Sequence, residues 1–125
     1  MLTIADIIWN RACQGNAGSA HLGDNRLAVM LRFHGRAMNG GVLHAIEGRS
    51  RATLHEVKQA FEYFNLPAVS AFISKAERII RDTAELSDFE GSLIADYGAT
   101  ASDSVLFDRF LQKLAEEPTE FEPIQ

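Results

Sequence analysis

The sequence has only one cysteine, only three prolines and no long apolar run. The shortage of cysteine and the lack of a long apolar run each exclude a class of protein. The single thiol of Cys13 can form neither an internal disulfide nor a cysteine-based zinc cluster, which suits a reducing cytoplasm. We expect Cys13 to be a small buried apolar side chain. Residues 1–6 lack the basic and apolar regions of a signal peptide, and no run is long enough to span a membrane. These absences predict a cytoplasmic protein.

The usual catalytic and metal-binding patterns are also absent. No serine lies in a Gly-x-Ser-x-Gly elbow, and Gly40-Gly41 is not followed by the Lys-Ser/Thr of a phosphate loop. The four histidines, at 21, 34, 44 and 55, show no i, i+4 pairing and no His-Glu-x-x-His motif. We therefore predict no catalytic residue, no metal and no cofactor. One alternative stays open, a small enzyme that uses His34 or His44 with an acid such as Glu47.

What the sequence does contain is helical periodicity in a chain of one-domain size. The 125 residues are 46% hydrophobic and 23% charged, as in an ordinary globular domain. Apolar residues recur at helical spacing between caps and turn-forming residues, and no segment reads as a strand. We predict an all-α fold, a single compact domain of about six or seven helices over residues 1–125. Residues 1–23 would form an N-terminal helix and a mobile loop, and residues 24–122 the core.

Caps and breakers set the expected helix ends. Hydroxyl or acidic N-caps, some followed by an acid three residues later, mark five starts, and glycine or proline marks several ends. The expected caps are Thr3, Asp24, Thr53 (in a capping box with Glu56), Ser87 (in a capping box with Glu90), and Ser102 or Asp103. Gly98 should end one helix and Pro118 the last, after which Phe121 should fold back onto the core.

The helix expected over residues 24–38 is apolar around most of its circumference, which predicts a central position. His34 falls on its apolar side, so we expect an inward histidine held by a hydrogen bond. The helix leads into a predicted structural turn formed by Asn39, Gly40 and Gly41, where glycine permits a positive φ. Valine at Gly40 or Gly41 should lower stability wherever φ is positive.

Charge is divided unequally along the chain. Residues 1–81 contain ten Lys or Arg against six Asp or Glu, net +4, and residues 82–125 contain two against eleven, net −9. Acids three or four residues apart on a helix have Cβ atoms about 5 to 6 Å apart, close to the spacing of charges along a nucleic-acid strand. Only Arg109 and Lys113 are available to pair with them. The candidate partner-binding residues are Glu85, Asp88, Glu90, Asp96, Asp103, Asp108, Glu116 and Glu117. The alternative is a solvated face that maintains solubility.

Several short motifs occur in the same order as in a known protein family. Asn39-Gly40-Gly41 follows a helix, Asn65-Leu66-Pro67-Ala68 joins an amphipathic pair, and Asp96-Tyr97 precedes a closing Phe110…Pro118-x-x-Phe121 pattern. Over residues 24–122 this resembles the bacterial domain-of-unknown-function family that includes a DNA mimic protein. The chain departs from the family at residues 42–46, where the family is commonly aromatic and glutamine-bearing.

The resemblance implies an all-α, dimeric protein, and one characterised activity in the family is to bind a transcriptional repressor in place of its operator DNA. With the charge pattern, it predicts a non-enzymatic binding domain whose acidic C-terminal surface engages a basic protein such as a DNA-binding transcriptional regulator. We expect no direct binding to nucleic acid and no membrane association. An immunity-type protein that neutralises a basic toxin is the alternative.

Overall fold

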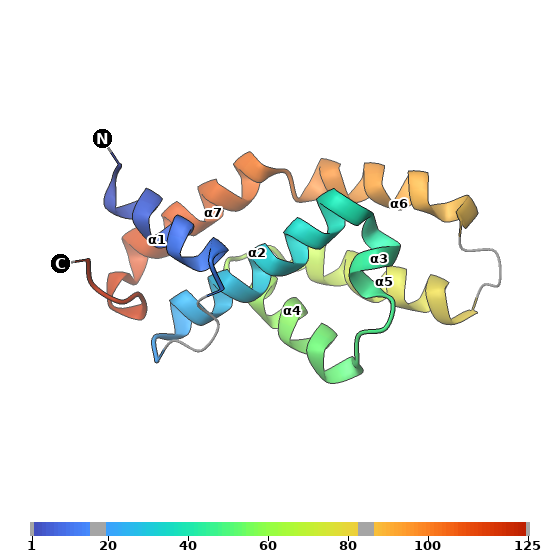
Figure 1. Ribbon diagram of the computed structural model, residues 1–125, viewed down its shortest axis with the longest axis horizontal. Helices are drawn as coiled ribbons and strands as arrows, with labels where there is room; N and C mark the ends of the chain where they lie inside the picture. Colours follow the sequence, from blue (N-terminus) through green and yellow to red (C-terminus); the bar gives the residue numbers. More distant parts are fainter. Residues whose placement is uncertain (1, 16–19, 83–86, 125) are drawn as a thin grey trace.

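The apolar second helix is the centre of the fold. This helix, α2 (Leu22–Gly40), buries nine of its 19 residues and contacts the first, third and fourth helices. Its buried side chains include Leu27, Met30 and Phe33, all of which are at most 2% exposed. A helix that is apolar on nearly all sides must be covered on nearly all sides. The predicted central position is confirmed (Figure 1).

The computed structural model describes residues 2–15, 20–82 and 87–124, apart from the side chains of residues 87–89. Within these residues the chain forms seven α-helices, one 3-10 helix and no strand. The remaining elements are α1 (Ile4–Cys13), α3 (Val42–Ile46), α4 (Arg51–Tyr63), α5 (Pro67–Asp82), α6 (Ser87–Thr100), α7 (Asp103–Glu116) and η1 (Pro118–Glu120). The predicted all-α, single-domain fold is confirmed.

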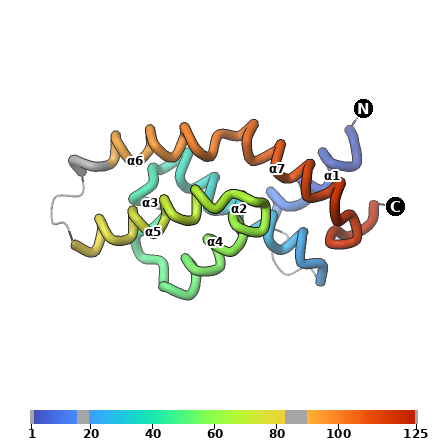
Figure 2. The backbone as a smooth tube through the Cα atoms, turned by 180° about the vertical axis from the view of Figure 1, so that it is seen from behind, coloured from blue at the N-terminus to red at the C-terminus, as the bar shows by residue number. Residues whose placement is uncertain are grey.

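The helices form an elongated bundle whose two long sides differ. Along one side α6 and α7 follow each other end to end, and along the other α4 and α5 form an antiparallel helical hairpin (Figure 1). The view from behind shows α4 and α5 in front of α2, so the hairpin covers α2 on that side (Figure 2). Helix α1 packs on α2 at the end where both termini lie.

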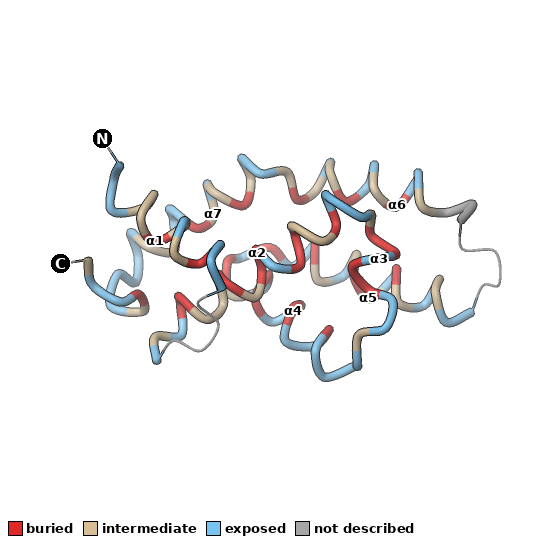
Figure 3. Tube along the Cα trace, viewed as in Figure 1, coloured by how far each residue is buried: buried red, intermediate tan, exposed pale blue. Residues whose placement is uncertain are grey.

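Buried positions face the axis of the bundle on every long helix, while the outer faces are exposed (Figure 3). Edge-to-face aromatic pairs support both ends of the core. Near α6, the ring centroid of Phe33 lies 6.0 Å from that of Phe61 and 6.0 Å from that of Tyr97. Near α1, the Trp9 ring lies 5.0 Å from Phe107. Such pairs add about 0.5–1.5 kcal/mol each beyond area burial.

The C-terminal tail closes the end of the core near α1. Phe121 is 2% exposed and its ring lies 5.6 Å from that of Phe110, which confirms that it folds back. The tail passes so close to Gly23 that a Cβ there would lie 2.8 Å from the Phe121 ring. Glycine at this position is therefore required by close approach.

Asp24 is not the cap of the central helix, contrary to the prediction. The helix begins at Leu22 after His21, and the Asp24 side chain is fully buried. Its carboxylate accepts a hydrogen bond from Arg11 Nη2 at 2.7 Å and another from the backbone N–H of Glu122 at 2.6 Å. The tertiary partners, which lie far away in the sequence, explain why a local capping rule failed here.

Other helix ends follow the sequence in part. Thr3 caps α1 in a capping box with Asp6, and Ser102 caps α7, as predicted. The cap of α4 is Ser50, one turn before the predicted Thr53. Two further predictions are wrong: Gly98 does not end α6, which continues to Thr100, and Cys13 is exposed instead of buried. Residues 16–19 of the predicted mobile loop and the side chain of Ser87, the predicted cap, lie outside what the structure describes.

No helix within the described ranges combines the length and the apolar composition needed to cross a membrane.

Candidate functional site

The predicted acidic residues differ in how far they are bound within the fold. Glu85 lies outside the described residues, as does the side chain of Asp88. The Glu90 side chain is directed to the turn before α3, and Asp103 is bound to a histidine. Asp103 is nevertheless exposed, with 85% of its side-chain area accessible. Four further predicted acids are exposed on α6, on α7 and directly after α7, and we call them the acidic edge: Asp96, Asp108, Glu116 and Glu117.

Glu90 completes the turn between α2 and α3. Its Oε2 accepts a hydrogen bond from the N–H of Leu43 at 3.2 Å, and a Cβ built on Gly41 would lie 1.5 Å from its Oε1. Gly41 also has a positive φ of 93°. Asn39 and Gly40 are the last residues of α2, so Gly41 alone makes the turn, which corrects the predicted three-residue turn. Glu90 thus has a structural function that its sequence position gave no reason to expect.

His34 joins three helices through its two ring nitrogens. It is 7% exposed, with Nδ1 2.8 Å from the Tyr97 hydroxyl on α6 and Nε2 2.5 Å from Asp103 Oδ1 at the start of α7. The predicted inward, hydrogen-bonded histidine is confirmed. Tyr97 is fully buried, and its burial, followed by the nearby charge of Asp103, raises the pKa of its hydroxyl well above the usual range.

An open groove of about 570 Å³ lies over His34 and Asp103. Apolar side chains from three helices make up most of its wall. Its lining residues are Trp9, Cys13, Leu31, His34, Gly35, Asp103, Ser104 and Phe107. Partial burial raises the pKa of the Cys13 thiol, which disfavours the reactive thiolate. Both nitrogens of His34 are engaged within the fold, so the ring presents no spare nitrogen for proton transfer with a ligand in the groove.

His44, the other histidine considered for chemistry, lies elsewhere. It is exposed and borders a groove of about 450 Å³ with Arg32, Arg36 and Asn39, which has no carboxylate in its described lining. The pKa of the Arg36 guanidinium is lowered, first by burial and then by the positive charges of Arg49 and Arg32. Glu47, the acid considered as a partner for either histidine, borders a separate groove, and within the described residues it forms no hydrogen bond or ion pair with His34 or His44.

The acids of the acidic edge make few internal contacts. Asp108 Oδ2 accepts a hydrogen bond from Gln112 Nε2 at 3.3 Å, and Glu117 pairs with Lys113 at 3.0 Å. The side chains of Asp96 and Glu116 form no hydrogen bond or ion pair with any residue that the structure describes. Lys113 also lies 4.3 Å from the centre of the Tyr63 ring, so one of the two nearby cations is held against the fold.

The acidic residues of the C-terminal helices and the basic residues of α4 and α5 lie on different sides of the fold. The acidic edge belongs to α6 and α7, which run along the long side opposite the α4–α5 hairpin (Figures 1 and 2). Four of the hairpin's cations line one groove between α4 and α5: Arg51, Lys58, Arg78 and Arg81. No grouping of three or more His, Cys, Asp or Glu side chains suited to a metal ion occurs within residues 2–15, 20–82 and 87–124.

No family model matches the chain, and no curated protein or solved structure matches it significantly. The resemblance to the family that includes a DNA mimic protein therefore stays a prediction.

Proposed function

We propose that the chain is a non-catalytic binding protein whose acidic edge docks on a basic protein. A DNA-binding transcriptional regulator, engaged in place of DNA, is the specific form that we propose, in line with the family resemblance. The observation that carries the proposal is the exposure of Asp96, Asp108 and Glu116 on two successive helices. Because these acids make few contacts inside the fold, they are available to a partner, and the cations of the α4–α5 hairpin are on a different side of the molecule.

Catalysis is not part of the proposal. The acid nearest to a histidine, Asp103, and the Tyr97 hydroxyl together occupy both ring nitrogens of His34. A general base needs a nitrogen within hydrogen-bond reach of its substrate. We therefore assign His34, Asp103 and Tyr97 to the packing of α2, α6 and α7.

The test is capture of partners from the native cell with three forms of the full chain. The first is unchanged, the second carries Asp108→Lys and Glu116→Lys, and the third carries Glu47→Lys and Glu56→Lys. The third variant changes the net charge equally at exposed acids outside the acidic edge. Asp103 is left unchanged because its substitution would disturb His34.

We expect the edge variant to lose the captured protein and the control variant to keep it. Affinity should fall as salt is raised, because the Debye length is about 8 Å at physiological ionic strength, and the loss should appear mainly in the association rate. Displacement of the captured protein by duplex DNA would indicate a DNA-binding regulator. A captured toxin whose activity is inhibited would support the immunity-type alternative. Equal capture by the edge variant, or an affinity insensitive to salt, would contradict the proposal.

A further inference from the structure

We propose a second binding site, for a compact anion with two or more adjacent phosphate groups, in the groove between α4 and α5. This groove of about 630 Å³ is comparable in size to small-ligand pockets. Its lining residues are Arg51, Ala52, His55, Lys58, Ser74, Glu77, Arg78 and Arg81. We call it the basic groove. The inference does not rest on the acidic edge, which lies on the other long side of the molecule.

Two matching rows of donors face each other across the basic groove. On α4, the row runs from Arg51 to Lys58 with steps of four and three residues, which places it on one helical face. On α5, the row from Ser74 to Arg81 has the same steps. Because the helices are antiparallel, Arg51 lies towards the same end of the groove as Arg81. A ligand in the groove would meet cations from both walls.

The polar lining is almost entirely a set of hydrogen-bond donors. Among the described lining residues the one carboxylate is that of Glu77, and it forms an ion pair with Lys58 across the groove, so it is not left to repel an anion. Arg51 and Arg78 form no ion pair with any residue in the described part of the chain. Arg81 forms an ion pair with its exposed neighbour Asp82, at 3.5 Å. Guanidinium groups bind phosphate oxygens through paired hydrogen bonds, so unpaired arginines facing one groove suit phosphate groups.

The size and surroundings favour a compact ligand over a nucleic-acid strand. Each row spans seven residues, which corresponds to about 10 Å of helix. Among the described residues the groove has no Phe, Tyr or Trp to stack on a base, as single-strand binding proteins do. The adjoining hollow, which Arg51 and Arg81 also line, adds one further cation, Arg49, next to the carboxylate of Glu47 and the apolar side chains of Ile46, Leu54 and Ile80. A long polyanion that continued there would meet a carboxylate and apolar side chains beside a single additional arginine.

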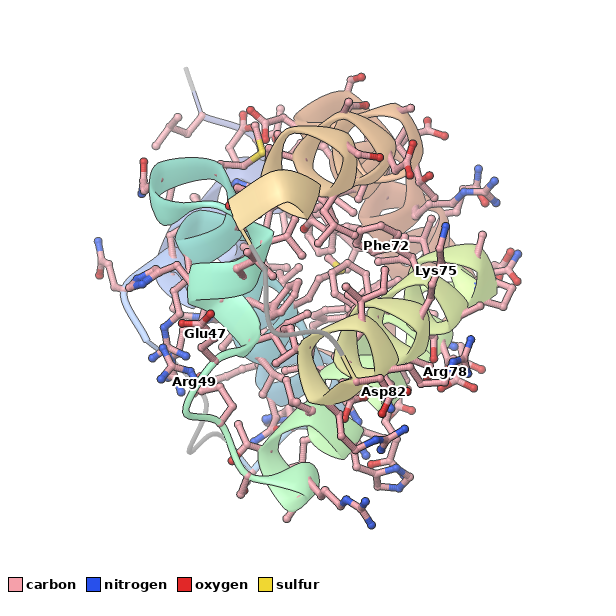
Figure 4. All side chains as sticks on the ribbon, turned by 90° about the vertical axis from the view of Figure 1, so that its right-hand side faces the viewer. Glu47, Arg49, Phe72, Lys75, Arg78 and Asp82 are labelled. Carbon is pink, nitrogen blue, oxygen red and sulfur yellow. The ribbon has the colours of Figure 1, made fainter. Side chains whose placement is uncertain are left out.

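The structure supplies a matched control on the same helix. Lys75 is exposed on the part of α5 that lies nearer to α6, next to Phe72, and does not line the basic groove, whereas Arg78, one turn further along α5, does (Figure 4). The Lys75→Gln variant therefore removes one positive charge from α5 without altering the groove, and Arg78→Gln removes one from within it. Both positions are exposed, so neither change should impair folding, and thermal unfolding followed by circular dichroism checks this.

The experiment is isothermal titration of the full chain with inorganic tripolyphosphate at low salt. We expect one site per chain, an affinity at least about tenfold lower in Arg78→Gln, and little change in Lys75→Gln, because charge-assisted hydrogen bonds contribute about 1.5–3 kcal/mol. The Arg51→Gln variant should weaken binding as Arg78→Gln does, which would show that both helices take part.

Two further titrations test the ligand class. Citrate, a polycarboxylate, and oligothymidylates of increasing length are titrated under the same conditions. Weaker binding of citrate and no gain in affinity with oligonucleotide length would support a compact phosphate ligand. The proposal is overturned by the absence of saturable binding to tripolyphosphate, by equal losses in Lys75→Gln and Arg78→Gln, by citrate binding as tightly, or by affinity that rises with strand length.

Discussion

At the scale of single residues, Gly41 shows how one position can be fixed by two independent constraints. Its φ of 93° is a conformation that residues with a Cβ rarely adopt, and the Glu90 carboxylate occupies the space where a Cβ would lie. The neighbouring Gly40 is different, because it is helical and a Cβ there would meet only the side chain of His44.

We predict that Gly41→Ala lowers the free energy of unfolding by about 1–3 kcal/mol. The control is Gly98→Ala: Gly98 lies within α6, has no positive φ, and would present its Cβ to open space. Alanine there should stabilise the fold by about 0.5–1 kcal/mol. Urea unfolding followed by circular dichroism measures both. Destabilisation by Gly98→Ala would instead indicate that α6 ends at Gly98, as the sequence pattern had suggested.

Tyr97 couples stability to alkaline pH. Its raised pKa means that the folded state holds the hydroxyl proton more tightly than the unfolded chain, where tyrosine titrates near about pH 10. The stabilisation is therefore complete below about pH 10 and decreases as pH rises above it. Tyr63 contributes in the same direction, because burial and the charges of Glu120 and Glu117 raise its pKa.

The Tyr97→Phe variant should lose about 1–3 kcal/mol at neutral pH, because His34 Nδ1 is left without its partner. Above about pH 10 its urea midpoint should fall less steeply than that of the unchanged protein, and Tyr63 should account for the remaining slope. Urea midpoints measured from pH 8 to pH 11 give the comparison. Parallel pH profiles would show that Tyr97 does not carry this dependence.

At the scale of elements, the start of α4 illustrates how a valid local rule can select the wrong turn. Thr53 and Glu56 satisfy the capping-box pattern, but Ser50 satisfies the hydroxyl requirement one turn earlier. In the structure Ser50 Oγ accepts the hydrogen bond from the N–H of Thr53 at 3.1 Å. Nothing between the two candidates prevents a helix, so the longer helix forms and keeps one more turn of backbone hydrogen bonds.

We predict that Ser50→Ala lowers the free energy of unfolding by about 1 kcal/mol, the usual effect of losing a helix cap. Glu56→Ala should change it by less than about 0.5 kcal/mol, because Glu56 is exposed and surface substitutions have small effects. Chemical denaturation of both variants provides the measurement. A larger effect for Glu56→Ala would restore the cap predicted at Thr53.

At the scale of the whole molecule, the buried Asp24 holds the two ends of the described chain together. It contacts Arg11 on α1 and the backbone of Glu122 in the tail, and Arg11 Nη2 also donates to the carbonyl of Glu122 at 3.1 Å. A buried carboxylate in such a network stabilises through its partners, which become unsatisfied when it is removed.

We predict that Asp24→Ala lowers the free energy of unfolding by about 3–5 kcal/mol, because Arg11 and the Glu122 N–H lose their buried acceptor. The tail should then be cleaved earlier in limited proteolysis than the helices. Asp108→Ala, which removes an exposed carboxylate, is the control and should leave both properties nearly unchanged. Equal protection of the tail in the two variants would contradict this account.

The sequence predicted the number, type and approximate position of the helices because their apolar spacing and caps are local. It also predicted the inward orientation of His34, since Leu27, Met30 and Leu31 share its face. What it could not provide were pairings across the fold: Glu90 over Gly41 spans 49 residues of sequence, and His34 to Asp103 spans 69. The basic groove was missed for the same reason, because its two rows are aligned only when α4 and α5 pack as a hairpin.

The contact between Asp24 and Glu122 also constrains when the N-terminal region can reach its final structure. The two residues are 98 positions apart, so during synthesis the Asp24 carboxylate lacks one of its two partners until the tail has emerged. Gly23 likewise faces an open space until Phe121 arrives to fill it. Helices α2 to α5 can pack on one another earlier, because their contacts lie within the first 82 residues. The contacts of α1 with α2 can also form early, but the α1 end of the core is complete only when Phe121 and Glu122 have been synthesised.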